Sequence, residues 1–259
     1  MTWCLVGSEM CIRDRCSRSH PVLRMTTRLP VSETFDSIQG EGSLLGTPSF
    51  FIRTAGCNLR CTWCDTPYAS WDAAGDQRSV ASLVEEVQQS GRRHVVLTGG
   101  EPLMFPGLVE LNDALREAGC HVTVETAGTL LLPLTCDLLS CSPKLSNSTP
   151  TNDPRDPSGQ WAERHEARRW RPEILSKLIQ QSVRTQWKFV VSSQQDLAEI
   201  DQMLAEVPPE RPEDVFLMPE GVTVPEPERV RWIVELCQKR GWCYGHRLHI
   251  ALFGNTRGT

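Results

Sequence analysis

Short β-rich runs alternate with amphipathic helical segments along most of this chain, and this alternation limits the folds open to it. In 80–89, for example, Val80, Leu83, Val84 and Val87 recur as they would on one face of a helix. The patterns predict further helices at 107–118, 172–181, 196–206 and 226–240. They predict strands at 49–54, 94–98, 121–126, 138–141, 187–191, 215–218 and 247–252. Strands separated by such helices indicate an α/β fold, a parallel sheet with helical crossovers.

Composition supports one globular unit. Hydrophobic residues make up 39% of the 259 residues and charged residues 23%, which is too apolar for a disordered chain. The net charge of −5 provides no general basic field, so we expect no direct nucleic-acid partner. No uninterrupted apolar stretch approaches the ~20 residues that span a bilayer, so we expect no membrane partner.

Two segments depart from the pattern. Residues 1–24 hold Cys4, Cys11 and Cys16 but no amphipathic period, and the stretch 4–15 resembles a translated sequencing-adapter peptide. We expect them to be a non-native extension of a single domain at 25–259; the alternative is a basic arm or an extra metal site. Residues 146–169 are polar and proline-rich, and we expect an irregular excursion over the sheet edge there.

The cysteines point to metal chemistry. The chain has eleven, an odd number, and no secretory signal, which argues against a disulfide framework and for a cytoplasmic, reduced protein. Cys57, Cys61 and Cys64 follow a predicted strand with three and two residues between them. Their thiolates suit an iron–sulfur cluster or zinc. A structural zinc site needs a fourth ligand, and the nearest histidine, His94, lies on a predicted strand. Three ligands suggest a site that holds an exogenous ligand.

The CxxxCxxC spacing resembles the radical S-adenosylmethionine (SAM) superfamily, and Gly99-Gly100-Glu101-Pro102 after the next predicted strand extends the resemblance. It implies an open partial (β/α) barrel of about six parallel strands with helical crossovers. Cys57, Cys61 and Cys64 would hold a catalytic 4Fe–4S cluster at the carboxyl ends of the strands. The fourth iron would be chelated by SAM, whose reductive cleavage yields a 5′-deoxyadenosyl radical.

Further segments narrow the resemblance, namely 33–42, 51–56, 64–66, 124–128, 142–144 and 247–259. From about residue 32 to the C-terminus the chain resembles the 7-carboxy-7-deazaguanine synthase family. This implies a ring-contracting lyase of 7-deazapurine and queuosine biosynthesis. It would convert 6-carboxy-5,6,7,8-tetrahydropterin to 7-carboxy-7-deazaguanine and release ammonia, with SAM as a cofactor that is not consumed and Mg²⁺ assisting.

Residue chemistry agrees with several of these roles. The Arg53 guanidinium could bind a substrate carboxylate through two parallel hydrogen bonds. The Gln39 side chain and the backbone of Ile38 and Gly40 offer the mixed donors and acceptors that a pterin edge requires. The Thr66 hydroxyl suits Mg²⁺, which prefers hard oxygen ligands.

The resemblance assigns the remaining positions. Cofactor contacts are expected at Trp63, Cys64, Asp65, Gly100, Glu101, Ser142, Pro143, Lys144 and Lys188. Substrate contacts are expected at Ile38, Gln39, Gly40, Arg53, Thr98, His249 and Thr259. The expected partners are the pterin substrate, an electron donor such as flavodoxin or ferredoxin, and a second copy of the chain in a homodimer. Two alternatives stay open: a glycyl-radical enzyme activase, which shares the CxxxCxxC loop, and a non-catalytic metal-binding scaffold.

Overall fold

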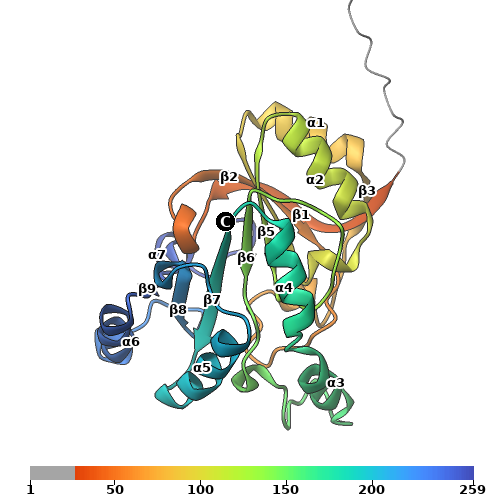
Figure 1. The fold of residues 1–259 in the computed structure, drawn as a ribbon. Coiled ribbons are helices and arrows are strands. Elements are labelled where there is room, and N and C mark those ends of the chain that lie inside the picture. Colours follow the sequence, from red (N-terminus) through yellow and green to blue (C-terminus); the bar gives the residue numbers. More distant parts are fainter. Residues whose placement is uncertain (1–26) are drawn as a thin grey trace, which may run out of the picture.

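The computed structural model describes residues 27–259, and their strands form a nine-stranded sheet of order β3-β1-β2-β4-β5-β6-β7-β8-β9 (Figure 1). The strands are β1 (Arg28–Ile38), β2 (Pro48–Thr54), β3 (Asp76–Ser79), β4 (His94–Gly99), β5 (His121–Thr126), β6 (Leu138–Cys141), β7 (Thr185–Val191), β8 (Val215–Pro219) and β9 (Cys243–Tyr244). The α-helices are α1 (Val80–Ser90), α2 (Gly107–Glu117), α3 (Gln160–Arg168), α4 (Pro172–Gln181), α5 (Leu197–Glu206), α6 (Pro227–Arg240) and α7 (Leu248–Phe253). The expectations for residues 1–24 lie outside the described residues. No helix within 27–259 combines the length and the apolar character needed to cross a bilayer.

The sheet is parallel from β2 to β9, which confirms the predicted α/β class. Each neighbouring pair in this part runs in the same direction, with registers such as Arg53 opposite Thr98 and Leu97 opposite Val124. At the other end β1 pairs antiparallel with both β2 and β3. Because β3 and β9 lie at the two ends of this order and do not pair with each other, the sheet is not closed and forms an open partial barrel, as predicted.

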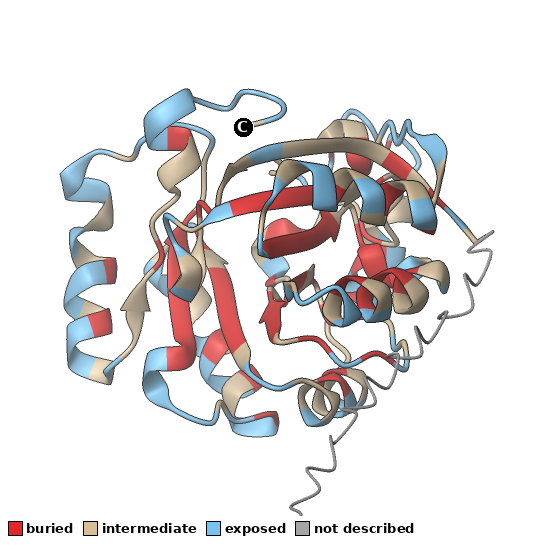
Figure 2. Ribbon diagram, turned by 90° about the horizontal axis from the view of Figure 1, so that it is seen from above, coloured by how far each residue is buried: buried red, intermediate tan, exposed pale blue. Residues whose placement is uncertain are grey.

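Helices cover one side of this sheet and bury a continuous apolar core. Buried side chains of α1, α2, α4, α5 and α6 pack on those of the parallel strands. Figure 2 shows the buried residues gathered on the strands and on the inward faces of the helices, with exposed residues on the outer faces. The largest fully buried side chains include Trp187 and Phe189, which stack in β7.

Local signals set helix boundaries where the sequence predicted them. The hydroxyl of Ser79 accepts a hydrogen bond from the Ser82 amide at 3.1 Å and caps the start of α1. The same helix ends at Gly91, whose φ of 69° is a left-handed conformation that glycine adopts without a Cβ clash. Val80, Leu83 and Val87 are buried, as the helical period predicts.

Two sequence predictions were wrong. Residues 247–252 were expected to be the last strand, but Leu248–Phe253 is the helix α7. Residues 146–169 were expected to be an irregular excursion, but residues 160–168 of this segment form the helix α3. The polar composition of this segment has a structural use that is described below.

Replacement of the fully buried Leu111 in α2 by alanine should destabilise the fold by about 2–5 kcal/mol, because it removes apolar contacts and leaves a cavity. Leu252→Ala in α7 is the matched control, since that side chain is 57% exposed and should cost no more than about 0.5 kcal/mol. Urea unfolding followed by circular dichroism measures both. Equal losses would contradict the assignment of Leu111 to the core.

Candidate active site

A cavity of about 460 Å³ opens at the carboxyl ends of the parallel strands. Its wall includes residues near the end of β2, β4, β5 and β8, such as Arg53, Thr98, Glu125 and Met218. Loops that follow those strands and the C-terminal segment complete it. Parallel α/β sheets bind ligands at this edge, because successive loops meet there.

The structure brings most of the predicted site residues together in this wall. They are Ile38, Gln39, Gly40, Arg53, Cys57, Cys61, Trp63, Cys64, Asp65, Thr66, Thr98, Gly100, Ser142, Lys144, Lys188, His249 and Thr259. The exceptions are Glu101 and Pro143, which do not line the cavity.

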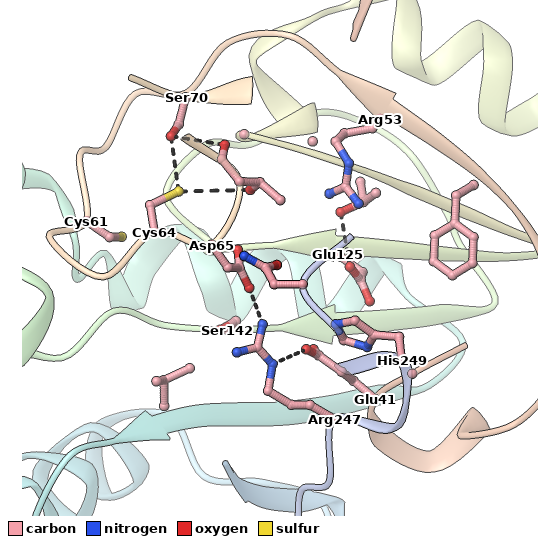
Figure 3. Close-up of a pocket in the computed structure, with 18 of the residues that line it drawn as sticks. Glu41, Arg53, Cys61, Cys64, Asp65, Ser70, Glu125, Ser142, Arg247 and His249 are labelled. Carbon is pink, nitrogen blue, oxygen red and sulfur yellow. Dashed lines mark hydrogen bonds and ion pairs between the residues drawn. The ribbon is translucent and has the colours of Figure 1, made fainter. Parts of the chain in front are cut away.

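The three cysteines of the loop after β2 (Cys57, Cys61 and Cys64) all line the cavity. Figure 3 shows Cys61 and Cys64 close together on one side of it. Burial raises the pKa of the Cys57 thiol to about 12, and it raises the pKa of Cys61 as well. A buried thiol of this kind loses its proton readily only when a cation compensates the charge. The Cys64 sulfur lies 3.1 Å from the Ser70 hydroxyl.

The arrangement fits a cluster better than a single ion. Within residues 27–259, no three His, Cys, Asp or Glu side chains converge closely enough to hold one metal ion. Cysteines that each bind a different iron of a cluster need not meet at one point. The donor set, thiols only and three in number, suits iron–sulfur chemistry.

Gly100 lets the loop after β4 pack against the cysteine loop. A Cβ atom there would lie 2.7 Å from the Cys57 Cβ and 2.5 Å from the Ala69 carbonyl oxygen, closer than real contacts allow. The neighbouring Glu101 is fully buried. Its carboxylate accepts hydrogen bonds from the Thr126 hydroxyl at 2.7 Å and the Ala127 amide at 2.9 Å. That carboxylate therefore holds the turn after β5 and does not face the cavity.

A network of charges crosses the cavity floor. The Lys188 ammonium lies 2.8 Å from Glu41 and 3.3 Å from Glu125. Arg247 pairs with Glu41 at 3.2 Å and also with Asp65 (Figure 3). Burial alone would lower the pKa of Lys188, but Glu125 and Glu41 outweigh it and raise the pKa. Burial would likewise raise the pKa of Glu41, but Lys188 and Arg247 hold it well below its usual range.

The Arg53 guanidinium is bound to the protein through its Nε edge. Its Nε donates to Glu33 at 2.7 Å, and the same carboxylate accepts from the Tyr68 hydroxyl at 2.8 Å. Within the described part of the chain, its terminal nitrogens donate no hydrogen bond to protein. The guanidinium therefore keeps its bidentate face for a carboxylate in the cavity.

The C-terminal segment folds back over the cavity. The Leu248 amide donates to the Gly40 carbonyl at 2.9 Å, which anchors α7 beside the Gln39–Gly40 turn. Further on, Arg257 donates to Glu33 at 3.0 Å and stacks 4.5 Å above the Tyr68 ring. The predicted tail residues therefore reach the cavity, although the secondary structure that carries them was predicted wrongly.

Several cavity residues carried no assigned role in the sequence analysis, namely Glu41, Tyr68, Glu125, Arg247 and Arg257. Glu41 and Glu125 lie inside segments 33–42 and 124–128, which carry the family resemblance. A carboxylate in such a segment could have indicated a site residue. Arg247 and Arg257 lie inside the segment 247–259, which the resemblance also used, but their glutamate partners are more than 200 residues away in the sequence, so their ion pairs could not be inferred.

The raised pKa of Cys57 predicts a pH profile. Iodoacetamide attacks the thiolate, so alkylation of Cys57 in metal-free folded protein should keep rising about tenfold per pH unit from pH 9 to 11. In urea the same residue should level off above about pH 9, because its pKa returns to the ordinary range. Mass spectrometry of the Cys57 peptide measures both rates. A plateau near pH 9 in the folded protein would contradict the burial argument.

Comparisons with known proteins agree with this geometry. Residues 51–145 match the Radical SAM superfamily. A 7-carboxy-7-deazaguanine synthase from Rhodopirellula baltica is 50% identical over 233 residues, which cover 89% of each chain. One from Halobacterium salinarum is 45% identical over 240 residues, 89% of this chain and 93% of that one. The crystal structure of QueE from Escherichia coli superposes with a TM-score of 0.63 at 26% identity, covering 86% of this chain and 95% of that one. Identity at this level over nearly the whole chain means that the protein belongs to the 7-carboxy-7-deazaguanine synthase family of radical SAM enzymes.

Proposed function

We propose that this enzyme converts 6-carboxy-5,6,7,8-tetrahydropterin into 7-carboxy-7-deazaguanine with release of ammonia. The observation that carries the proposal is that one cavity combines the three-cysteine loop with Arg53, near the end of β2 that precedes this loop, and that within residues 27–259 the terminal guanidinium nitrogens of Arg53 are free to bind a carboxylate. Membership of the family supports this reaction over a glycyl-radical activase or a non-catalytic scaffold.

Cys57, Cys61 and Cys64 would hold a 4Fe–4S cluster, and SAM would complete it. When bound and reduced, these groups supply a carbon radical able to abstract hydrogen from the substrate. The cofactor is proposed to lie along residues of the adjoining wall, namely Trp63, Asp65, Gly100, Ser142, Lys144 and Lys188. Lys144 supports this placement, because its ammonium donates to the Ser142 hydroxyl at 2.8 Å and lies 5.7 Å from the Trp63 ring.

The substrate is proposed to occupy the opposite side. Arg53 would bind the pterin carboxylate through its free face, with Glu33 fixing the orientation of the guanidinium. The Gln39 amide bonds Glu125 at 3.3 Å and accepts from the Glu41 amide at 3.1 Å, so it serves mainly to set the turn. The pterin edge would then meet the backbone of Ile38 and Gly40, the carboxylate of Glu125, and Thr98. His249 and Thr259 would cover the substrate from the C-terminal side.

Fixed charges in the wall preorganise this pocket for a ligand. Lys188 stays cationic and Glu41 anionic at neutral pH because each neutralises the other. Neither has to change protonation when a ligand enters, so the site stays electrostatically preorganised. Closure by the C-terminal segment would exclude water from a reactive radical.

The remaining assignments are also proposals. Thr66 would contribute a hydroxyl ligand to Mg²⁺, and its place in the cavity wall beside Asp65 supports this. Residues 25–259 would form one domain that acts as a homodimer in the cytoplasm, reduced by flavodoxin or ferredoxin. The eight cysteines within residues 27–259 are all unpaired, which suits a reducing compartment.

The direct test is anaerobic turnover. The reconstituted protein is supplied with reductant, Mg²⁺, SAM and the carboxypterin, and products are followed by mass spectrometry. We expect 7-carboxy-7-deazaguanine without stoichiometric loss of SAM. Formation of 5′-deoxyadenosine without that product would keep the radical chemistry and reject the substrate.

Arg53→Lys should raise the KM for the carboxypterin by about 10- to 100-fold, because an ammonium cannot form the bidentate pair. Arg92→Lys is a matched control: Arg92 also donates its Nε to a carboxylate at 2.7 Å, that of Asp36, but it is 40% exposed and outside the cavity. Steady-state kinetics in both variants separate substrate binding from general effects of losing a guanidinium. An unchanged KM in Arg53→Lys would reject the proposed carboxylate site.

A further inference from the structure

The polar segment that follows β6 contacts the cysteine loop on the side away from the cavity. In Figure 1 its helix α3 lies below α4, apart from the helices that cover the sheet. We call residues 146–169 the brace. The structure gives this segment direct contacts with the residues between the three cysteines.

The cysteine loop alternates between two environments. Cys57, Leu59, Cys61 and Trp63 line the cavity, whereas Asn58, Arg60 and Thr62 do not. The Arg60 amide instead donates to His165 Nδ1 at 3.1 Å, and the Thr62 amide donates to the Ser148 carbonyl at 2.9 Å. An Arg168 nitrogen approaches the Asn58 carbonyl at 3.4 Å. The brace thus binds Asn58, Arg60 and Thr62, the residues between the cysteines that do not line the cavity.

His165 lies at the centre of these contacts. Its ring is fully buried, and since Nδ1 accepts from Arg60, Nε2 carries the proton toward the Ser148 hydroxyl at 2.9 Å. That hydroxyl donates onward to the Leu145 carbonyl at 2.6 Å. The imidazole therefore joins the cysteine loop to both ends of the brace through bonds of defined direction.

Further contacts with the brace hold Thr62, Arg60 and Trp63 of the cysteine loop. Arg155 donates to the Thr62 carbonyl at 2.7 Å and pairs with buried Asp153, which accepts from the Thr62 hydroxyl at 3.2 Å. The Arg60 guanidinium stacks 4.1 Å from the Trp161 ring. Trp63, on the cavity side, donates its indole N–H to Asn147 at 3.1 Å.

We propose that the brace sets the backbone conformation of the cysteine loop before a cluster binds, with His165 as its central positioning residue. This rests on the proposed cluster at Cys57, Cys61 and Cys64. The three thiols have no attraction for one another, so the loop needs an external support to keep them on one wall. The brace supplies that support through hydrogen bonds to the backbone of the cysteine loop and not through contacts with the cysteine sulfurs.

The test compares two buried histidines. His94 is a matched control, because it is equally enclosed and bonds two hydroxyls, Ser49 at 2.6 Å and Thr123 at 2.8 Å, on the sheet. Burial lowers the pKa of both His94 and His165 to about 4, so both replacements remove a neutral imidazole. Full-length His165→Ala and His94→Ala are purified metal-free, and hydrogen exchange is measured on peptides covering residues 58–64.

We expect exchange in this peptide to rise at least about tenfold in His165→Ala, the effect of losing one buried hydrogen bond, and to stay unchanged in His94→Ala. After reconstitution, a chelator should remove iron from His165→Ala about tenfold faster. His165→Asn should recover most of the protection, since its amide oxygen can accept from the Arg60 N–H. Equal exchange in the two alanine variants, or no recovery in His165→Asn, would overturn the proposal.

Arg155→Met covers the case in which His165→Ala fails to fold, because Arg155 is exposed and still bonds the Thr62 carbonyl. It should raise exchange of the same peptide about threefold or more, and an unchanged rate would count against the brace. The iron content of the reconstituted wild-type protein is measured separately and tests the proposed cluster. If wild type fails to take up about four irons per chain, the proposed cluster is rejected, whereas the exchange result still reports on the loop.

Discussion

Lys188 is buried in the cavity wall with its ammonium 2.8 Å from Glu41 and 3.3 Å from Glu125. These contacts tie β7 to the segment after β1 and to the end of β5, and Arg247 extends them to the C-terminal helix. Loss of one partner from such a buried group would leave a charge without compensation, at a cost of about 3–5 kcal/mol. In the described part of the chain, the cavity side of the sheet has no apolar core, and it therefore keeps its shape through these charge pairs.

This constraint explains why the two sides of the sheet differ in composition. The side covered by helices is apolar and continuous, so its stability comes from burial of surface. The cavity side is lined by charged, polar and sulfur-bearing residues that would be costly to bury alone. The charged groups discussed above all pair with another group of the protein, but the terminal nitrogens of the Arg53 guanidinium remain free among the described residues. A ligand bound to these nitrogens would therefore add the most stabilising interaction.

The sequence predicted elements where local signals suffice. Residues 172–181 were predicted as a helix and form α4 with the same bounds, since its apolar period and initial proline are local features. Residues 247–252 were misread because Leu248, Ile250 and Leu252 alternate like a strand over too short a stretch to separate the two periods. Only Ile250 is buried, and the contact of the Leu248 amide with Gly40 comes from the distant N-terminal turn.

The sequence predicted which residues lie in the candidate site better than it predicted what each of them contacts. Cys57, Arg53 and Lys188 were expected in the site and lie in the cavity wall, because Arg53 is near the end of β2, Cys57 is in the loop that follows it, and Lys188 is within β7. Glu101 was expected to meet the cofactor through its carboxylate or backbone, but the carboxylate bonds Thr126 inside the fold. A partner 25 residues away cannot be inferred from the type of residue alone.

Residues 146–169 give the clearest case of this limit. Their polarity resembles that of a solvated loop, and composition cannot distinguish side chains that face water from side chains that bond another backbone. Here His165 and Asp153 are buried because they satisfy groups of the cysteine loop. In this eight-residue loop the residues that do not line the cavity, Asn58, Arg60 and Thr62, are polar, so their groups need partners of their own. The polar segment and the cysteine motif are therefore parts of one structural unit, although about 80 residues separate them in the sequence.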